Sequence, residues 1–105
     1  MRALQLERLD GPEGLKLVDV PEPEAGDQVL IDVRAAGVSF PDLLLTKGQY
    51  QMKPPLPFVP GVEVAGVVRA APAGSGFKAG DRVMAFTMLG GWADVVAAPP
   101  GMTFR

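Results

Sequence analysis

Glycine and proline divide this chain into short apolar stretches, and this division limits what it can fold into more than any other feature. The 105 residues include 13 glycines and 11 prolines, which separate stretches of Val, Leu and Ile instead of forming low-complexity tracts. Short apolar stretches between turn residues are typical of β-strands, and this length is enough for one domain with one core. The sequence therefore predicts a mostly β fold, a sandwich or a barrel, with one or two short helices.

Six stretches have the character of strands, and the one at 28–36 is the strongest. Its odd-numbered positions from 29 to 35 are apolar, whereas Asp32 and Arg34 interrupt the other face, as a half-buried antiparallel strand requires. The stretch 61–68 is apolar enough to be buried on both faces, apart from Glu63. The other strands are expected at 2–6, 15–20, 82–86 and 92–96, with 92–96 as the last.

One convincing helix start follows the strand at 28–36. Ser39 stands at the N-cap position, Pro41 falls in the first turn, and Asp42 completes the pattern of a capping box. Three consecutive leucines give the helix an apolar body, and Gly48 is suited to end it in a left-handed C-cap. We expect a short helix here, held in place by the strands.

The absence of Cys and His excludes several kinds of chemistry. The chain has no disulfide, none of the usual zinc ligand sets and no Ser-His or Cys-His nucleophile, and its carboxylates are not clustered for a hard cation. The net charge of −2, without a basic run, argues against nucleic-acid binding. No apolar stretch has the length of a membrane span, and residues 1–10 lack a signal-peptide core. We therefore expect a cytoplasmic protein without a metal, nucleic-acid or membrane partner.

Three motifs suggest binding, but each has a simpler explanation. Gly74-x-Gly76-x-x-x-Gly80 superficially resembles a dinucleotide fingerprint, yet it leads into a strand and not into the helix that a phosphate needs. The PxxP pattern at 54–57 is better explained as a rigid surface connection, and the acidic stretch 21–27 as a solvated loop. We do not expect this chain alone to hold a whole dinucleotide.

Glu63 is the one carboxylate within the apolar stretch 61–68. A carboxylate in such a position needs a partner or a polar cavity, because burying an unpaired charge is costly. Either it faces solvent or pairs with an arginine such as Arg34 or Arg69, or it borders a ligand cleft.

Four segments, taken together, are a more specific indication of a protein family than any single motif. They are Gly37-Val38-Ser39-Phe40-Pro41-Asp42-Leu43, Gly48-x-Tyr50, Pro57-x-x-Pro60-Gly61-x-Glu63-x-x-Gly66-x-Val68 and Gly80-Asp81-Arg82-Val83. In this order they resemble the N-terminal GroES-like domain of the medium-chain dehydrogenase/reductase superfamily, over almost the whole chain. The resemblance implies a partly open GroES-like β-barrel.

The resemblance is to the zinc-independent quinone oxidoreductase branch of that superfamily. Ser39, Phe40 and Val62 stand where the zinc enzymes of the superfamily have Cys, His and His, and the structural zinc lobe is missing. The resemblance therefore implies a zinc-free enzyme that transfers a hydride from NADPH to an electron-poor quinone or alkene. Within this class, quinone, enone and enoyl-thioester acceptors are not separated by the sequence.

The resemblance also implies that the segment 39–43 lies beside the nicotinamide. Ser39, Phe40, Asp42 and Leu43 are the candidate cofactor contacts, although a helix cap is the simpler role for Asp42. Ser39 and Phe40 are candidate substrate contacts as well, together with Tyr50 and Glu63. For Tyr50 the alternative is a tyrosine packed in a loop. No residue is assigned as catalytic.

Enzymes of this superfamily hold their cofactor mainly in a second, Rossmann-type domain, which this chain lacks. We therefore expect residues 1–105 to be the substrate-side domain of a longer enzyme and to be inactive alone. The resemblance is compatible with a homodimeric parent. The rival interpretation is a stand-alone β-domain that acts as an interaction module through exposed strand edges.

Overall fold

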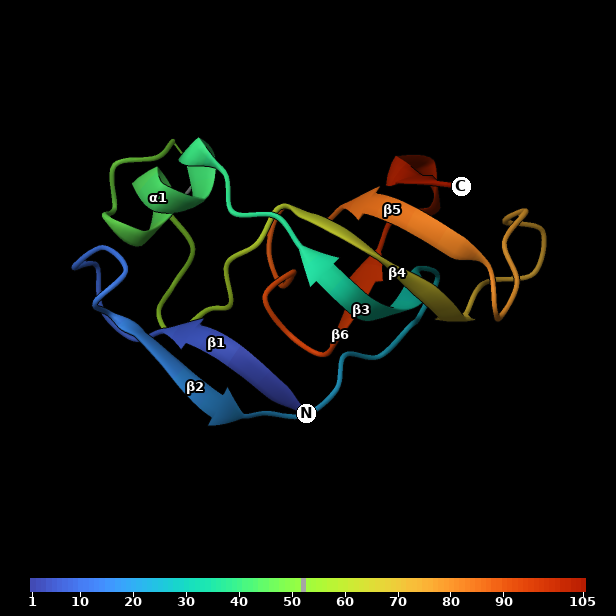
Figure 1. Ribbon diagram of the computed structural model, residues 1–105, viewed down its shortest axis with the longest axis horizontal. Coiled ribbons are helices and arrows are strands. Elements are labelled where there is room, and N and C mark those ends of the chain that lie inside the picture. The colour runs from blue at the N-terminus through green and yellow to red at the C-terminus, as the bar shows by residue number, and fades with distance from the viewer. Residues whose placement is uncertain (52) are drawn as a thin grey trace.

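The computed structural model describes residues 1–51 and 53–105 and is mostly β, with a curled sheet that forms part of a barrel (Figure 1). The elements in this described part are β1 (Arg2–Leu6), β2 (Leu15–Asp19), β3 (Val29–Ala36), α1 (Phe40–Thr46), β4 (Glu63–Ala70), β5 (Arg82–Phe86), β6 (Val95–Ala98), the 3-10 helix η1 (Pro100–Met102) and β7 (Thr103–Phe104). The mostly β, partly open barrel expected from the sequence is confirmed. None of the helices described is long and apolar enough to cross a membrane.

The strands form two antiparallel sheets. One is the hairpin of β1 and β2, and the other has the order β6-β3-β4-β5-β7. Figure 1 shows the hairpin and α1 on one side of the molecule, with β3 leading from the larger sheet to α1. The short link from β3 to α1 thus joins the two sides.

The core of the larger sheet comes from alternate positions of four strands. Its buried members are Val29 and Ile31 of β3, Val64 and Val68 of β4, Val83 and Ala85 of β5, and Val96 and Ala98 of β6. The expectation that β4 is buried on both faces is wrong, because Ala65 is exposed and Val67 only half-buried between the buried positions. An antiparallel sheet can leave one face in water, and this one does.

The expected last strand at 92–96 is also wrong in its limits. Trp92–Asp94 cross to the hairpin, where the N–H of Leu4 donates to the Trp92 carbonyl at 2.9 Å and the N–H of Asp94 donates to the Arg2 carbonyl at 3.0 Å. The strand proper is therefore β6, from Val95, and β7 follows it as an additional edge strand. Pairing with β1 draws Trp92 and Ala93 out of the larger sheet, whereas the carbonyl of Asp94 still accepts from the Val33 N–H of β3 at 2.8 Å.

The acidic loop at 21–27 is exposed over much of its length, as expected, but one of its carboxylates is held by the larger sheet. Arg69 of β4 forms ion pairs with Glu22 at 2.7 Å and with Asp32 of β3 at 2.6 Å. The hydrogen bonds to Asp32 and then to Glu22 raise the pKa of Arg69 above its ordinary value, so this cation stays charged in neutral and moderately basic solution.

A very close backbone approach between β3 and β4 depends on Gly66. A Cβ atom at Gly66 would stand 2.1 Å from the carbonyl oxygen of Asp32, a contact that requires the strands to separate. We expect Gly66→Ala to lower the free energy of unfolding by about 1–3 kcal/mol in urea titrations. Gly101→Ala is the control, because an added Cβ there meets nothing within 4 Å. Equal midpoints for the two variants would contradict the close approach.

Candidate functional site

The link from β3 to α1 is fixed at Gly37 by two segments that lie far away in the sequence. The N–H of Gly37 donates to the Glu63 carbonyl at 3.0 Å, and the carbonyl of Gly37 accepts from the Trp92 indole Nε1 at 2.9 Å. A Cβ at Gly37 would lie 2.3 Å from Glu63 Oε1, so the Glu63 side chain packs directly against Gly37 and a larger residue there would have to displace it. Both polar groups of Gly37 are thus satisfied just before the predicted site begins.

Ser39 and Asp42 form the capping box that the sequence predicts at the start of α1. Asp42 Oδ2 accepts from both the backbone N–H and the Oγ of Ser39, each at 3.0 Å. Asp42 is 0% exposed, and its Oδ1 has no hydrogen-bond partner among the residues described. At the other end, Gly48 has the positive φ of 70° suited to a C-cap. The cap role of Asp42 is confirmed, and its contact with a cofactor stays a prediction.

Two apolar side chains flank Ser39 and face solvent. Val38 is 80% exposed and Phe40 is 69% exposed, whereas Ser39 between them is half-buried. Large apolar side chains at such exposure provide a surface against which a flat ring or another protein surface can pack.

Glu63 begins β4 and is half-buried, with its carboxylate beside Gly37. The expected alternative of an ion pair with Arg34 or Arg69 is not found in the described part of the chain, since Arg69 pairs with Glu22 and Asp32. Glu63 therefore adjoins the segment that leads to Ser39, and a role in binding substrate stays a prediction.

Tyr50 lies in a different cluster. It is half-buried and packs against the small core of Leu6, Leu45 and Phe58 beneath α1. This is the packed loop tyrosine that the sequence left open as an alternative. The structure thus brings Ser39 and Glu63 together through Gly37 and places Tyr50 in a separate apolar cluster.

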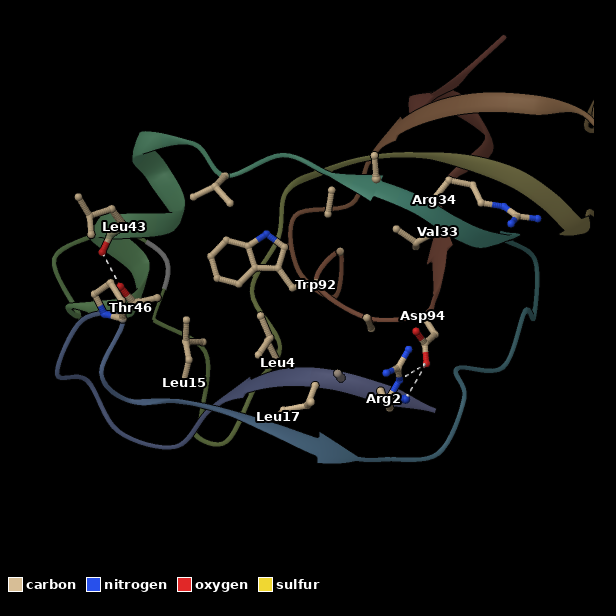
Figure 2. Close-up of a pocket in the computed structure, with 17 residues that line it drawn as sticks. Arg2, Leu4, Leu15, Leu17, Val33, Arg34, Leu43, Thr46, Trp92 and Asp94 are labelled. Carbon is tan, nitrogen blue, oxygen red and sulfur yellow. Dashed lines mark hydrogen bonds and ion pairs between the residues drawn. The ribbon is translucent and has the colours of Figure 1, made fainter.

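An apolar groove of about 640 Å³ separates the hairpin from α1 and β3 (Figure 2). Trp92 lies across it, above Leu4 of β1 and Leu17 of β2, with Leu43 and Thr46 of α1 at one end. Among the residues described, Leu43 is the only predicted site residue that lines this groove, and a second groove of about 360 Å³ contains none of them. Sequence analysis missed Trp92, whose only signal was that it is the single tryptophan of the chain.

The glycine turn between β4 and β5 is not built as a pyrophosphate site. The glycines from Gly74 to Gly80 lie in the connection from β4 to β5, which leads into a strand and not into a helix. A pyrophosphate site of the usual kind needs a helix N-terminus at that point. Nor do the described residues include any group of three or more His, Cys, Asp or Glu side chains placed to hold a metal ion. What the site offers is an oriented hydroxyl at Ser39 beside exposed apolar side chains.

Comparison with known proteins identifies the family. The model of the alcohol dehydrogenase GroES-like domain matches residues 25–104. This chain belongs to that family. The GroES-like assignment within the medium-chain dehydrogenase/reductase superfamily, and to its zinc-independent quinone oxidoreductase branch, is confirmed by the likeness to proteins named quinone oxidoreductase.

Three of the relatives of this GroES-like domain show how far the likeness extends. Quinone oxidoreductase of Rattus norvegicus is 42% identical over 99% of this chain and 33% of its own length. The crystal structure of a probable oxidoreductase from Mycobacterium abscessus matches with a TM-score of 0.97 and 57% identity, over 100% of this chain and 34% of the other. Quinone oxidoreductase from Thermus thermophilus, solved also in complex with NADPH, matches with a TM-score of 0.83 and 42% identity, over 100% and 32%. The chain thus spans about a third of the length of these relatives.

The capping carboxylate is a point at which the local structure can be tested. Asp42→Ala removes the acceptor of the Ser39 N–H and Oγ–H, so we expect the free energy of unfolding to fall by about 1–3 kcal/mol. Asp27→Ala is the control, because it removes the same charge from an exposed loop position. Urea titration of both variants measures the difference. Stability of Asp42→Ala equal to that of Asp27→Ala would show that the cap contributes nothing.

Proposed function

We propose that this chain is the substrate-side domain of a zinc-free, NADPH-dependent quinone or enone oxidoreductase. The observation that carries the proposal is the likeness to quinone oxidoreductases along the whole chain, one of them solved with NADPH. The resemblance assigns the segment from Ser39 to Leu43 to the nicotinamide, and the exposed side chain of Phe40 supports this assignment. We further propose a cytoplasmic, homodimeric parent enzyme.

In this proposal the chain works by positioning. NADPH, when bound, supplies the hydride, and its phosphates are held mainly by a domain outside these residues. Ser39, Phe40 and Leu43 lie along the nicotinamide, and Asp42 acts on it only through the hydroxyl of Ser39. Because Ser39 Oγ donates its hydrogen to Asp42, its lone pairs are left to accept a hydrogen bond from a ligand N–H or O–H.

The acceptor is held on the same side of the site. Glu63 stands next to the link that carries Ser39, and the exposed Phe40 offers a flat apolar surface for a quinone ring. Apolar side chains around the reacting carbon exclude water and keep the hydride donor close to the acceptor. Tyr50 is half-buried against the cluster of Leu6 and Phe58, and we propose that its exposed part contacts the substrate.

The isolated chain should not bind NADPH appreciably. The glycine turn before β5 opens no helix, and no other segment in the described part of the chain is suited to a nucleotide phosphate. Isothermal titration calorimetry with residues 1–105 is expected to give no binding in the sub-millimolar range. A sub-millimolar dissociation constant would contradict the proposal that NADPH is held mainly by a separate cofactor domain.

The full-length protein is expected to oxidise NADPH with quinones or enones as acceptors. In an acceptor screen, Ser39→Ala should lower kcat/KM by up to about tenfold, which corresponds to the loss of one hydrogen bond to the bound ligand. Tyr50→Phe tests the second predicted contact, and Ser75→Ala is the control, since Ser75 lies in a turn beyond β4. Absence of turnover with every acceptor in the wild-type protein would overturn the proposed function.

A second candidate function is an interaction module. Met84 and Phe86 of β5 and Phe104 of β7 are exposed apolar side chains on the larger sheet, and the rings of Phe86 and Phe104 meet edge to face at 6.5 Å. Exposed apolar side chains beside a short edge strand favour contact with another protein surface. A wild-type protein without NADPH-dependent turnover would favour this alternative.

A further inference from the structure

Trp92 connects three parts of the chain that lie far apart in sequence. Its carbonyl accepts from the Leu4 N–H at 2.9 Å, and its own N–H donates to the Pro60 carbonyl at 3.0 Å. Its indole Nε1 donates to the Gly37 carbonyl at 2.9 Å. The residue therefore ties the hairpin, the approach to β4 and the start of the predicted site to one another.

The geometry points to Trp92 as a positioning residue for the hydride transfer. We propose that the indole N–H, by holding the Gly37 carbonyl, fixes how far the segment at Ser39 stands from the larger sheet and hence how the nicotinamide meets the acceptor. This inference rests on the proposed function and adds to it a residue that touches neither cofactor nor substrate.

The link from Gly37 to Ser39 needs such a restraint because the hydrogen bonds of Ser39 run to α1 and do not tie the link to the larger sheet. Val38 is 80% exposed, so its side chain contributes little packing. The two polar groups of Gly37 are its nearest fixed points, and the Glu63 carbonyl holds only one of them. Without the indole N–H, the Gly37 carbonyl is free to rotate toward water and the start of α1 can shift.

The surroundings of the ring show that its position is itself defined. A Cβ at Gly61 would lie 2.6 Å from the Trp92 backbone N and 2.8 Å from its Cδ1, so the Gly61 backbone packs directly on this residue. Figure 2 shows the ring lying across the groove between α1 and the hairpin. Because the ring is rigid and the Gly61 backbone supports it from one side, the position of the ring determines where its N–H holds the Gly37 carbonyl.

The test removes the donor and keeps the ring. In the full-length protein, Trp92→benzothienylalanine replaces the indole N–H with sulfur at nearly the same shape, and Trp92→Phe is a second variant made by ordinary mutagenesis. We expect kcat to fall by about tenfold or more with the KM for the quinone nearly unchanged, because misplacement of the reacting groups lowers the rate of the chemical step. The primary isotope effect with 4-deuterated NADPH should change as well.

A matched control separates positioning from simple support. Thr103→Val removes a comparable bond, from Thr103 Oγ1 to the Pro99 carbonyl at 2.9 Å, which involves neither Gly37 nor the Gly61 backbone that supports Trp92. The amide signal of Gly37 in the [15N]glycine-labelled protein should move with the loss of the Trp92 donor and stay in place in Thr103→Val.

The possible results are distinguishable. A wild-type protein without NADPH-dependent turnover overturns the proposed function and this inference with it. If the wild-type protein turns over and the Trp92 variants move the Gly37 signal but keep kcat, only the positioning role fails. An equal fall of kcat in Thr103→Val also overturns it, because the effect is then one of general support.

Discussion

The pairing of β3 with β4 is the constraint on which the rest of this structure depends. It places Gly66 directly against the backbone of Asp32, and it joins the two strands that supply half of the buried core of the larger sheet. The same pairing brings the end of β3 to the beginning of β4, where the N–H of Gly37 meets the Glu63 carbonyl. A shift by one residue would turn the buried side chains outward and separate Gly37 from Glu63. Core and candidate site thus share one register.

The features that the sequence predicted well are those whose conformation depends only on a few neighbouring residues. The cap at Ser39 and Asp42 and the positive φ at Gly48 follow from local chemistry, so their positions were correct. The alternation in β3 predicted an antiparallel strand, although burial is complete only in its first half, at Val29 and Ile31. Local signals are reliable here because each satisfies its own hydrogen bonds or packing without help from distant residues.

The features that were missed or wrong depend on contacts between distant residues. Nothing near Trp92 reveals that its indole reaches Gly37, which lies 55 residues earlier. The partners of Arg69 were not predicted for the same reason, since Glu22 and Asp32 reach it only once the strands are paired. The outward face of β4 was also missed, because valine and alanine suit a buried and a half-exposed strand equally well. Order of strands and choice of partner are therefore properties of the assembled sheet.

In the proposed function, a chain without His or Cys has few ways to contribute to a hydride transfer, and holding the reactants in place is one of them. The backbone N–H and the hydroxyl of Ser39 are both directed at Asp42, and both polar groups of Gly37 are held by Glu63 and Trp92. Groups engaged in this way fix the position of whatever packs against them. In the proposed reaction, hydride transfer depends steeply on the distance between donor and acceptor carbons, so holding the Ser39 segment in place would contribute to the rate. In this proposal, the polar contacts around Gly37 allow the larger sheet to fix the position of the Ser39 segment and hence the distance between hydride donor and acceptor.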